Sequence, residues 1–233
     1  SLQRVMHAAA PCPVDIKKQM IDWWGPIVDE YYASSEAIGS TLITADEWLA
    51  HPGSVGRAMT GTLHIVGEDG TELPAGQAGE IYFEGGFDFE YLNDSEKTAK
   101  ARSAQGWKTV GDIGYLDEDG YLYLTDRRHH MIISGGVNIY PQEAENMLVT
   151  HPKVMDAAVF GIPDDEMGQS VKGVVQTVDQ ADATDEFAEE LLAWLREHLT
   201  HYKCPRSISF EAQLPRTDTG KLYKQTLIDK YSG

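Results

Sequence analysis

The sequence predicts an α/β and α+β fold in two domains, and three changes of pattern along the chain support this prediction. Residues 1–52 combine helical periodicity with a short strand, which indicates an α/β piece. Residues 53–126 consist of short strands separated by turns, which is typical of a small antiparallel β-barrel or a curved sheet. Residues 127–233 mix strands with amphipathic helices, so we expect a compact α+β domain there.

Periodicity and end signals place the helices. Pro13 and Pro141 suit the first turn of a helix, and Thr44 is a good N-cap that precedes two acidic residues. Leucines spaced by four residues give 185–199 one apolar face. The helices expected on these grounds are 13–24, 44–50, 94–102, 141–149, 185–199 and 222–231.

Short apolar runs bounded by turn residues place the strands. The segments 67–70 and 117–120 end in Gly after acidic residues, and we expect them to close hairpins. The other strands expected are 26–32, 131–134, 153–161, 170–178 and 207–211. The charged segment 126–130 predicts the joint between domain 1–126 and domain 127–233.

Composition and charge exclude some classes of protein. The 233-residue chain has a net charge of −18, which argues against nucleic acid as a partner because phosphate backbones need basic surfaces. Residues 1–126 hold 8 Lys/Arg and 21 Asp/Glu, net −13, whereas 127–233 hold 11 and 16, net −5, so an anionic ligand is expected on the second part. No apolar run is long enough for a transmembrane segment. Cys12 and Cys204 are typical of free thiols in a reducing, cytoplasmic compartment.

The segment 31–39, YYASSEAIG, ends an expected strand with groups that suit a nucleotide. The ring of Tyr32 can stack on a planar base, a hydroxyl such as that of Ser35 can bond a phosphate oxygen, and the carboxylate of Glu36 can hold Mg²⁺. Upstream, Ala8 and Ala9 have small side chains that let a flat ligand approach the backbone. Taken alone, the segment also fits an ordinary strand end.

Two further segments add groups of the same kind. Asp112 follows Gly111 at the end of a strand, where a carboxylate can accept two hydrogen bonds from a ribose diol, although a plain turn-forming Asp fits as well. Arg127 can bond the same ribose. Gly135 and Gly136 can bring bare backbone close to a ligand. The adjacent histidines 129–130 are not expected to bind a metal, because their side chains point apart.

The stretch 214–224, LPRTDTGKLYK, places Lys221 on a short Gly-containing turn. An ammonium held on such a turn can be brought against a reacting phosphate, where it stabilises the negative charge that develops. By itself the stretch also fits an ordinary surface loop, but it follows three segments that suit the same chemistry.

In this order and spacing, the four segments resemble the adenylate-forming superfamily, which includes acyl-CoA synthetases, adenylation domains of peptide synthetases and insect luciferases. The resemblance covers the whole chain but only the later half of such an enzyme, because nothing here matches the family's loop for the ATP phosphates. It implies that 1–126 ends the family's large N-terminal domain and that 127–233 is its mobile C-terminal lid domain. The chain does not begin with Met, so we expect a fragment whose partner is its own N-terminal half.

The resemblance also implies a role for each site residue. Tyr32 would stack on adenine near Ala8 and Ala9, Ser35 would touch the α-phosphate, and Glu36 would bind Mg²⁺. Asp112 and Arg127 would hold the ribose of ATP or AMP. The remaining roles fall to three groups of the C-terminal domain: His129 at the hinge, Gly135 and Gly136 in the channel for coenzyme A, and Lys221 at the acyl carboxylate and phosphate.

The activity implied is two half-reactions. A carboxylic acid and ATP give an acyl-adenylate and pyrophosphate, and coenzyme A then displaces AMP to give a thioester, while the C-terminal domain rotates between the steps. A fatty acid is the expected substrate, with a small aromatic or other short acid as the alternative. Two other interpretations stay open, namely a non-catalytic fragment that binds nucleotide or coenzyme A, and an unrelated protein whose motifs match by chance.

Three positions depart from the family's pattern. Ala33 stands where Gly is usual and adds a methyl group near the acyl entrance, and Val110 stands where Thr is usual and lacks its hydroxyl. His129 occupies the hinge position, which usually holds Asp or Lys.

The histidine at the hinge makes a prediction. Because an imidazole titrates near neutrality, domain rotation in the full-length enzyme should depend on pH between about 6 and 7.5. The measurement is the pH profile of thioester formation in the wild type and in His129→Asp. An identical profile in both proteins would contradict the hypothesis.

Overall fold

The computed structural model describes residues 1–218 and 220–232, which divide into two units, Ser1–Arg128 and His129–Gly233. The helices of the first unit are α1 Val14–Trp24, α2 Ala45–Ala50 and α3 Ser95–Lys100. Its strands are β1 Val5–His7, β2 Val28–Ala33, β3 Ser40–Ile43, β4 Arg57–Thr60, β5 Thr62–Val66, β6 Gly79–Glu84, β7 Asp112–Leu116 and β8 Leu122–Arg127. A 3₁₀ turn, η1 Arg128–His130, crosses the division between the units.

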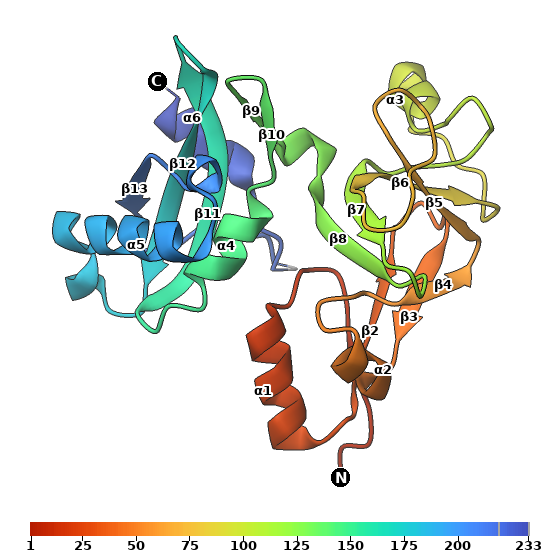
Figure 1. Cartoon of the computed structure of the whole chain (residues 1–233), viewed down its shortest axis with the longest axis horizontal. Coiled ribbons are helices and arrows are strands. Elements are labelled where there is room, and N and C mark those ends of the chain that lie inside the picture. Colours follow the sequence, from red (N-terminus) through yellow and green to blue (C-terminus); the bar gives the residue numbers. More distant parts are fainter. Residues whose placement is uncertain (219, 233) are drawn as a thin grey trace. The chain divides into compact units, whose positions relative to one another are not determined.

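Two four-stranded sheets form the first unit (Figure 1). One has the order β1-β2-β3-β4, with β1 and β2 parallel and joined by α1, and the other pairs antiparallel. The second has the order β5-β6-β7-β8 and is antiparallel throughout. In the described residues this sheet is open, with β5 and β8 at its edges, so of the two expected forms, a small antiparallel β-barrel or a curved sheet, the sheet is the one that forms.

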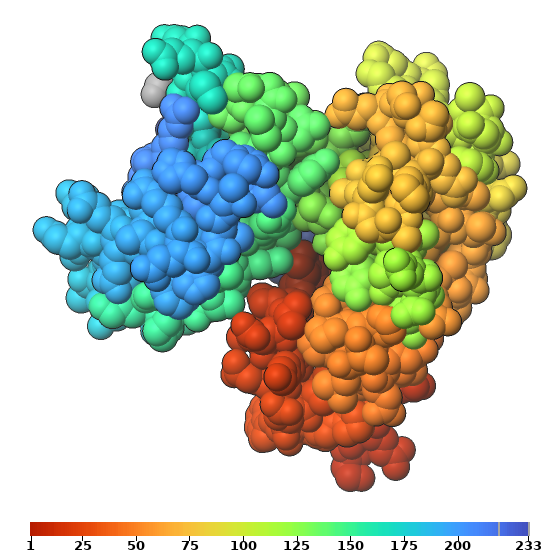
Figure 2. Space-filling view, viewed as in Figure 1, coloured from red at the N-terminus to blue at the C-terminus, as the bar shows by residue number. Residues whose placement is uncertain are grey.

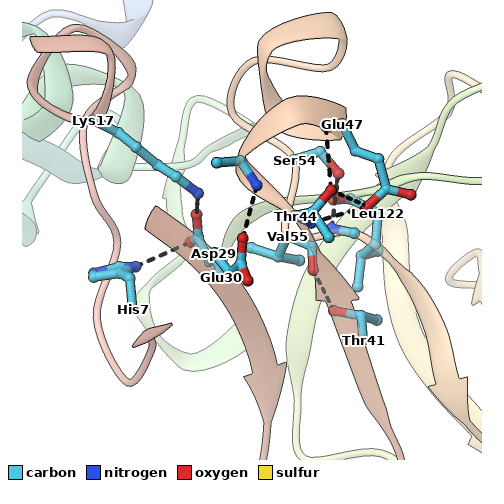
Figure 3. A network of polar contacts seen from close by, with 12 residues as sticks. His7, Lys17, Asp29, Glu30, Thr41, Thr44, Glu47, Ser54, Val55 and Leu122 are labelled. Carbon is cyan, nitrogen blue, oxygen red and sulfur yellow. Dashed lines mark hydrogen bonds and ion pairs between the residues drawn. The ribbon is translucent and has the colours of Figure 1, made fainter. Parts of the chain in front are cut away.

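Leu122, the fully buried first residue of β8, fastens the second sheet to the segment after α2. Its N–H donates to the carbonyl oxygen of Gly56 at 2.8 Å. Its own carbonyl oxygen accepts from the Val55 N–H at 2.9 Å and from the Ser54 hydroxyl at 2.8 Å (Figure 3). These bonds satisfy backbone groups that burial would otherwise leave unpaired.

A buried ion pair ties α1 to the first sheet. Lys17 is fully buried, and its Nζ lies 2.5 Å from Oε2 of Glu30 on β2 (Figure 3). The same ammonium lies 4.8 Å from the centre of the Trp48 ring. His7, at the end of β1, places Nδ1 3.3 Å from Oε1 of Glu30. A charge this deep is tolerated only because it is paired.

One sheet, covered on both faces, forms the core of the second unit. The order is β10-β9-β12-β11, and β13 pairs parallel with β12. Its strands are β9 Ile132–Ser134, β10 Val137–Ile139, β11 Val154–Asp164, β12 Gly168–Thr177 and β13 Ser207–Phe210. Its helices are α4 Gln142–Leu148, α5 Asp185–His198 and α6 Lys224–Tyr231, with short 3₁₀ turns η2 Gln180–Asp182 and η3 His201–Lys203.

Alternation along β11 explains the two layers of helices. Val159 faces a core that includes Leu191 of α5 and residues of α4, whereas its neighbour Phe160 faces a core that includes Leu227 of α6. Successive side chains of a strand point to opposite faces, so a strand buried on both faces is apolar at both. The blue surface of α5 forms much of the visible face of this unit in Figure 2.

Most expected elements are confirmed within a few residues. Thr44 caps α2, and with Glu47 it forms a capping box. The turn 117–120 joins β7 to β8, as expected, while 67–70 leads only to a single bridge between Val66 and Glu72 before β6. The short strands β1, β3 and β10 were not expected, whereas β4 lies in the stretch 53–126, where short strands were expected without exact bounds.

No helix in the described part of the chain is long and apolar enough to cross a membrane.

The buried pair makes a stability prediction. Lys17→Met leaves the carboxylate of Glu30 buried without its ammonium, and the free energy of unfolding should fall by roughly 3–5 kcal/mol. Urea denaturation of the chain measures this change. Lys18→Met is the matched control, because Lys18 is the exposed neighbour on the same helix. Equal stability of the two variants would show that the pair contributes little.

Candidate nucleotide and lysine sites

Three predicted site residues meet in the first unit. The Tyr32 hydroxyl, on β2, donates to Oδ2 of Asp112 at 2.6 Å, and Nε of Arg127 lies 3.2 Å from Oδ1 of the same carboxylate. Asp112 begins β7 and Arg127 ends β8, and the two residues are directly paired in the antiparallel register. Cross-strand partners have neighbouring side chains, so the register itself brings the carboxylate and the guanidinium together.

This cluster is partly buried. Asp112 is buried, whereas Arg127 is about half exposed and Tyr32 packs beside Phe83, with ring centroids 6.4 Å apart. Burial raises the pKa of the Tyr32 phenol, and the negative charge and hydrogen bond of Asp112 raise that pKa further. The phenol therefore stays a donor that orients the carboxylate of Asp112.

The parallel strands explain why Ala8 and Ala9 belong to the same edge. In the register of β1 and β2, His7 pairs with Glu30, so both strands end in the same direction. Ala8 and Ala9 follow the end of β1, and Tyr32 lies near the end of β2. Ligands of α/β sheets bind outside the carboxyl ends of parallel strands.

The turn after β2 carries the hydroxyls and Glu36. Ala37 has φ +54°, a backbone conformation that is uncommon without Gly, and its N–H donates to the carbonyl oxygen of Ser34 at 3.1 Å. Ser35 is exposed, as a phosphate ligand must be. The Ser34 Oγ is buried and has no hydrogen-bond partner within residues 1–218 and 220–232. An unpaired hydroxyl of this kind suits a bound polar group.

Tyr91, which the sequence did not single out, holds Glu36. Its hydroxyl donates to Oε1 of Glu36 at 2.9 Å, and burial together with this bond raises the pKa of Tyr91 to about 12. Across the described residues, Oε2 of Glu36 has no hydrogen bond or ion pair. A single oriented carboxylate oxygen fits Mg²⁺, which usually takes one or two carboxylates and completes its shell with phosphates and water.

In the second unit, Gly135 and Gly136 form the exposed turn between β9 and β10. Their φ values are +57° and +79°, which a two-residue hairpin turn of this type requires and which Gly adopts without strain. The Gly135 N–H donates to the carbonyl oxygen of Met167, in the turn between β11 and β12, at 2.9 Å. A Cβ on Gly135 would lie 2.4 Å from Cε of Met167. Gly135 therefore packs closely on Met167, whereas a Cβ on Gly136 would meet nothing within 4 Å, so its backbone is bare on the exposed side of the turn.

Lys221 is exposed on a turn of its own. Its N–H donates to the Thr217 hydroxyl at 3.1 Å, and its carbonyl oxygen accepts from the Thr217 N–H at 2.9 Å. Arg216, just before this turn, forms a two-pronged contact with Asp156 on β11. The exposed Lys221 thus has both its backbone N–H and its backbone carbonyl oxygen bonded to Thr217.

The two loops of the second unit are attached near opposite ends of the β11–β12 hairpin. The Lys221 turn is fixed to Asp156, near the start of β11, whereas the Gly135–Gly136 turn is fixed to Met167, beyond its end (Figure 1). At about 3.3 Å per residue, these attachment points are roughly 25 Å apart. His129 is exposed in η1, where the second unit begins, with its ring 4.2 Å from that of His130.

Comparisons with known proteins match both units. The family model described as AMP-binding enzyme matches residues 1–89, and that described as AMP-binding enzyme C-terminal domain matches residues 143–221. A 2-succinylbenzoate–CoA ligase of Bacillus mycoides is 34% identical over 228 residues, covering 97% of this chain and 46% of the relative. A feruloyl-CoA synthase of Amycolatopsis is 37% identical over 226 residues, covering 96% and 45%. A long-chain-fatty-acid–CoA ligase of Mycobacterium tuberculosis is 35% identical over 208 residues, covering 88% and 40%.

Solved structures agree with this match. The amide bond synthetase McbA of Marinactinospora thermotolerans superposes with a TM-score of 0.83 at 32% identity, covering 99% of this chain and 47% of that chain. ATP-bound MatB of Rhodopseudomonas palustris gives a TM-score of 0.82 at 29% identity, covering 98% and 45%. The chain spans less than half the length of these relatives. It belongs to the adenylate-forming superfamily of AMP-binding enzymes.

Proposed function

We propose that the protein activates a carboxylic acid with ATP as an acyl-adenylate and then transfers the acyl group to coenzyme A, with release of AMP. The observation that carries this proposal is the cluster of Tyr32, Asp112 and Arg127, which combines a ring, a buried carboxylate and a guanidinium at the carboxyl edge of a parallel pair. The curated relatives named above are CoA ligases, which supports the same reaction.

The groups of the first unit suit the nucleotide. Tyr32 and Arg127 already fix the orientation of the Asp112 carboxylate. It can therefore accept hydrogen bonds from the ribose hydroxyls with little further loss of side-chain entropy. Tyr32 offers a ring for adenine, Ser35 offers an exposed hydroxyl to the α-phosphate, and Glu36 would hold Mg²⁺. The metal would neutralise phosphate charge, and it is proposed here because Glu36 is oriented by Tyr91.

The groups of the second unit suit the two half-reactions. Lys221 carries a cation on a fixed turn and would bridge the acyl carboxylate and the phosphate during adenylation. Gly135 and Gly136 present bare backbone, and they would line the passage for the pantetheine arm of coenzyme A. His129, at the start of the unit, would be the hinge between the two working positions.

We propose a fatty acid as the substrate and a cytoplasmic location for the reaction. A feruloyl-CoA synthase and a 2-succinylbenzoate–CoA ligase are also among the relatives, so aromatic acids are the competing class. The deciding experiment is thioester formation by the full-length protein, with ATP and coenzyme A, against fatty acids of several lengths and a set of aromatic acids. Residues 1–233 alone are proposed to lack adenylation activity, and pyrophosphate exchange by the purified chain above background would contradict this.

The ribose contact makes a prediction. Asp112→Asn replaces a charged acceptor with a neutral one, and hydrogen bonds to charged groups contribute about 1.5–3 kcal/mol each, so the KM for ATP should rise at least tenfold. The matching change in the substrate is the removal of one ribose hydroxyl, as in 2′-deoxy-ATP or 3′-deoxy-ATP. Wild-type enzyme should discriminate against these analogues, and Asp112→Asn should discriminate less. Unchanged discrimination in the variant would remove Asp112 from the ribose site.

The lysine makes a second prediction. Lys221→Ala should reduce adenylate formation by about 10²–10³-fold, because one preorganised donor is lost at the developing charge. Thioester formation from a supplied acyl-adenylate should stay within a few-fold of wild type. Lys153→Ala, which removes another lysine of the second unit that pairs with Asp182, is the control and should change neither rate. Equal loss of both half-reactions in Lys221→Ala would rule out the assigned role.

A further inference from the structure

The Arg216 guanidinium connects the Lys221 turn to the central sheet of the second unit. Its Nε donates to Oδ2 of Asp156 and its Nη2 donates to Oδ1, both at 2.7 Å. Its remaining terminal nitrogen, Nη1, donates to the carbonyl oxygen of Gly220 at 2.6 Å. The Arg216 side chain therefore bonds both the Asp156 carboxylate on β11 and the carbonyl oxygen of Gly220, the residue directly before Lys221.

We call this contact, which runs from Asp156 through the Arg216 guanidinium to the carbonyl oxygen of Gly220, the Arg216 strut. Its geometry is rigid. A planar guanidinium that meets a carboxylate through two parallel hydrogen bonds has its orientation fixed as well as its position. Because the third bond leaves from the same plane, the carbonyl oxygen of Gly220 is fixed relative to Asp156. The side chain of Asp156 is mostly buried, whereas that of Arg216 is about two-fifths exposed. The strut is therefore anchored in the domain at Asp156 and reaches the turn through Arg216.

The base of the same segment is held by other contacts. The Leu214 N–H donates to Oε1 of Gln176 at 3.1 Å, and Leu214 itself is buried. After the turn, Lys224 is buried, with its Nζ 2.7 Å from Oε1 of Glu145. These contacts keep the segment folded on the domain without help from Arg216. The hydrogen bond from Arg216 to the carbonyl oxygen of Gly220 acts at the turn between these contacts, where it can orient the turn.

We propose that Arg216, braced by Asp156, is a positioning residue that sets the direction in which Lys221 points. The proposal rests on the proposed role of Lys221 in adenylation. Neither Arg216 nor Asp156 touches the substrate in this scheme, and both act through the carbonyl oxygen of Gly220 and the turn closed by Thr217. A displacement of about 1 Å at a group that stabilises a transition state can cost roughly 10²-fold in rate.

The test compares variants that loosen the strut from its two ends. Arg216→Gln removes all three bonds, and adenylation measured by pyrophosphate exchange should fall roughly 10²-fold. Asp156→Asn leaves the turn itself unaltered but breaks the charged fork, and it should lower adenylation by about tenfold. In both variants, thioester formation from a supplied acyl-adenylate should stay within about twofold of wild type, because that step does not use Lys221. Arg216→Lys keeps the charge without the fork and should fall between wild type and Arg216→Gln.

A matched control exists on the same strand. Arg206 pairs with Asp164, 3.2 Å apart, at the other end of β11 and away from the Lys221 turn. Arg206→Gln removes this pair, which is a single Nη1–Oδ2 contact, so it reports the effect of losing an Arg–Asp pair elsewhere on β11. Both half-reactions should be unchanged in this variant.

A second measurement does not depend on catalysis. Trypsin cleaves after Lys221 only when the turn can adapt to the protease, so mass spectrometry of limited digests reports how firmly the turn is held. Arg216→Gln and Asp156→Asn should accelerate this cleavage several-fold, and Arg206→Gln should not.

Adenylation and thioester formation that fall together, or adenylation that is unchanged in Arg216→Gln, would overturn the proposal. A wild-type protein that forms no adenylate would instead overturn the proposed function. In that case the rate of tryptic cleavage after Lys221 still tests whether Arg216 holds the turn. A rate that is unchanged in Arg216→Gln would contradict this inference independently of the proposed function.

Discussion

The hydrogen bond from Tyr32 to Asp112 is the contact on which the first unit's site depends. It joins residues 80 positions apart and connects the sheet that contains β2 to the sheet that contains β7. Asp112 is buried, so its charge needs both the phenol and Arg127 to be tolerated. The anchoring of β8 by Leu122 keeps the second sheet in place. Without this connection, the ring of Tyr32 would not meet the carboxylate and the guanidinium, which the register of β7 and β8 already brings together.

The sequence was sufficient for the class of the fold and for the residues at loop tips. Helices such as α5 have a clear apolar face, and Thr44 shows a capping pattern that depends on residues three apart. The sequence left a small barrel and a curved sheet as alternatives, because closure depends on how strands pair at the edges of a sheet and short alternating runs do not determine this. The register that places Asp112 beside Arg127 likewise became visible only in the structure.

The supporting residues could not be predicted for a related reason. Tyr91 holds Glu36 from 55 positions away, and Asp156 holds Arg216 from 60 positions away. Neither Tyr91 nor Asp156 lies in a Gly-containing turn or in a recognisable motif, and nothing in local periodicity points to a partner so distant. Residues that touch a ligand are recognisable by chemical type, whereas residues that orient them become recognisable only through contact. The same distinction separates the Lys221 turn from the Arg216 strut.

The long β11–β12 hairpin has a consequence for timing. Its two ends each hold one loop, and because β12 also pairs with β9 and β13, the hairpin is part of a sheet that does not bend enough to bring both loops to one small molecule. Occupancy of a shared target by one loop therefore excludes the other. In the proposed two half-reactions, the length of the hairpin alone would make the two loops act one after the other.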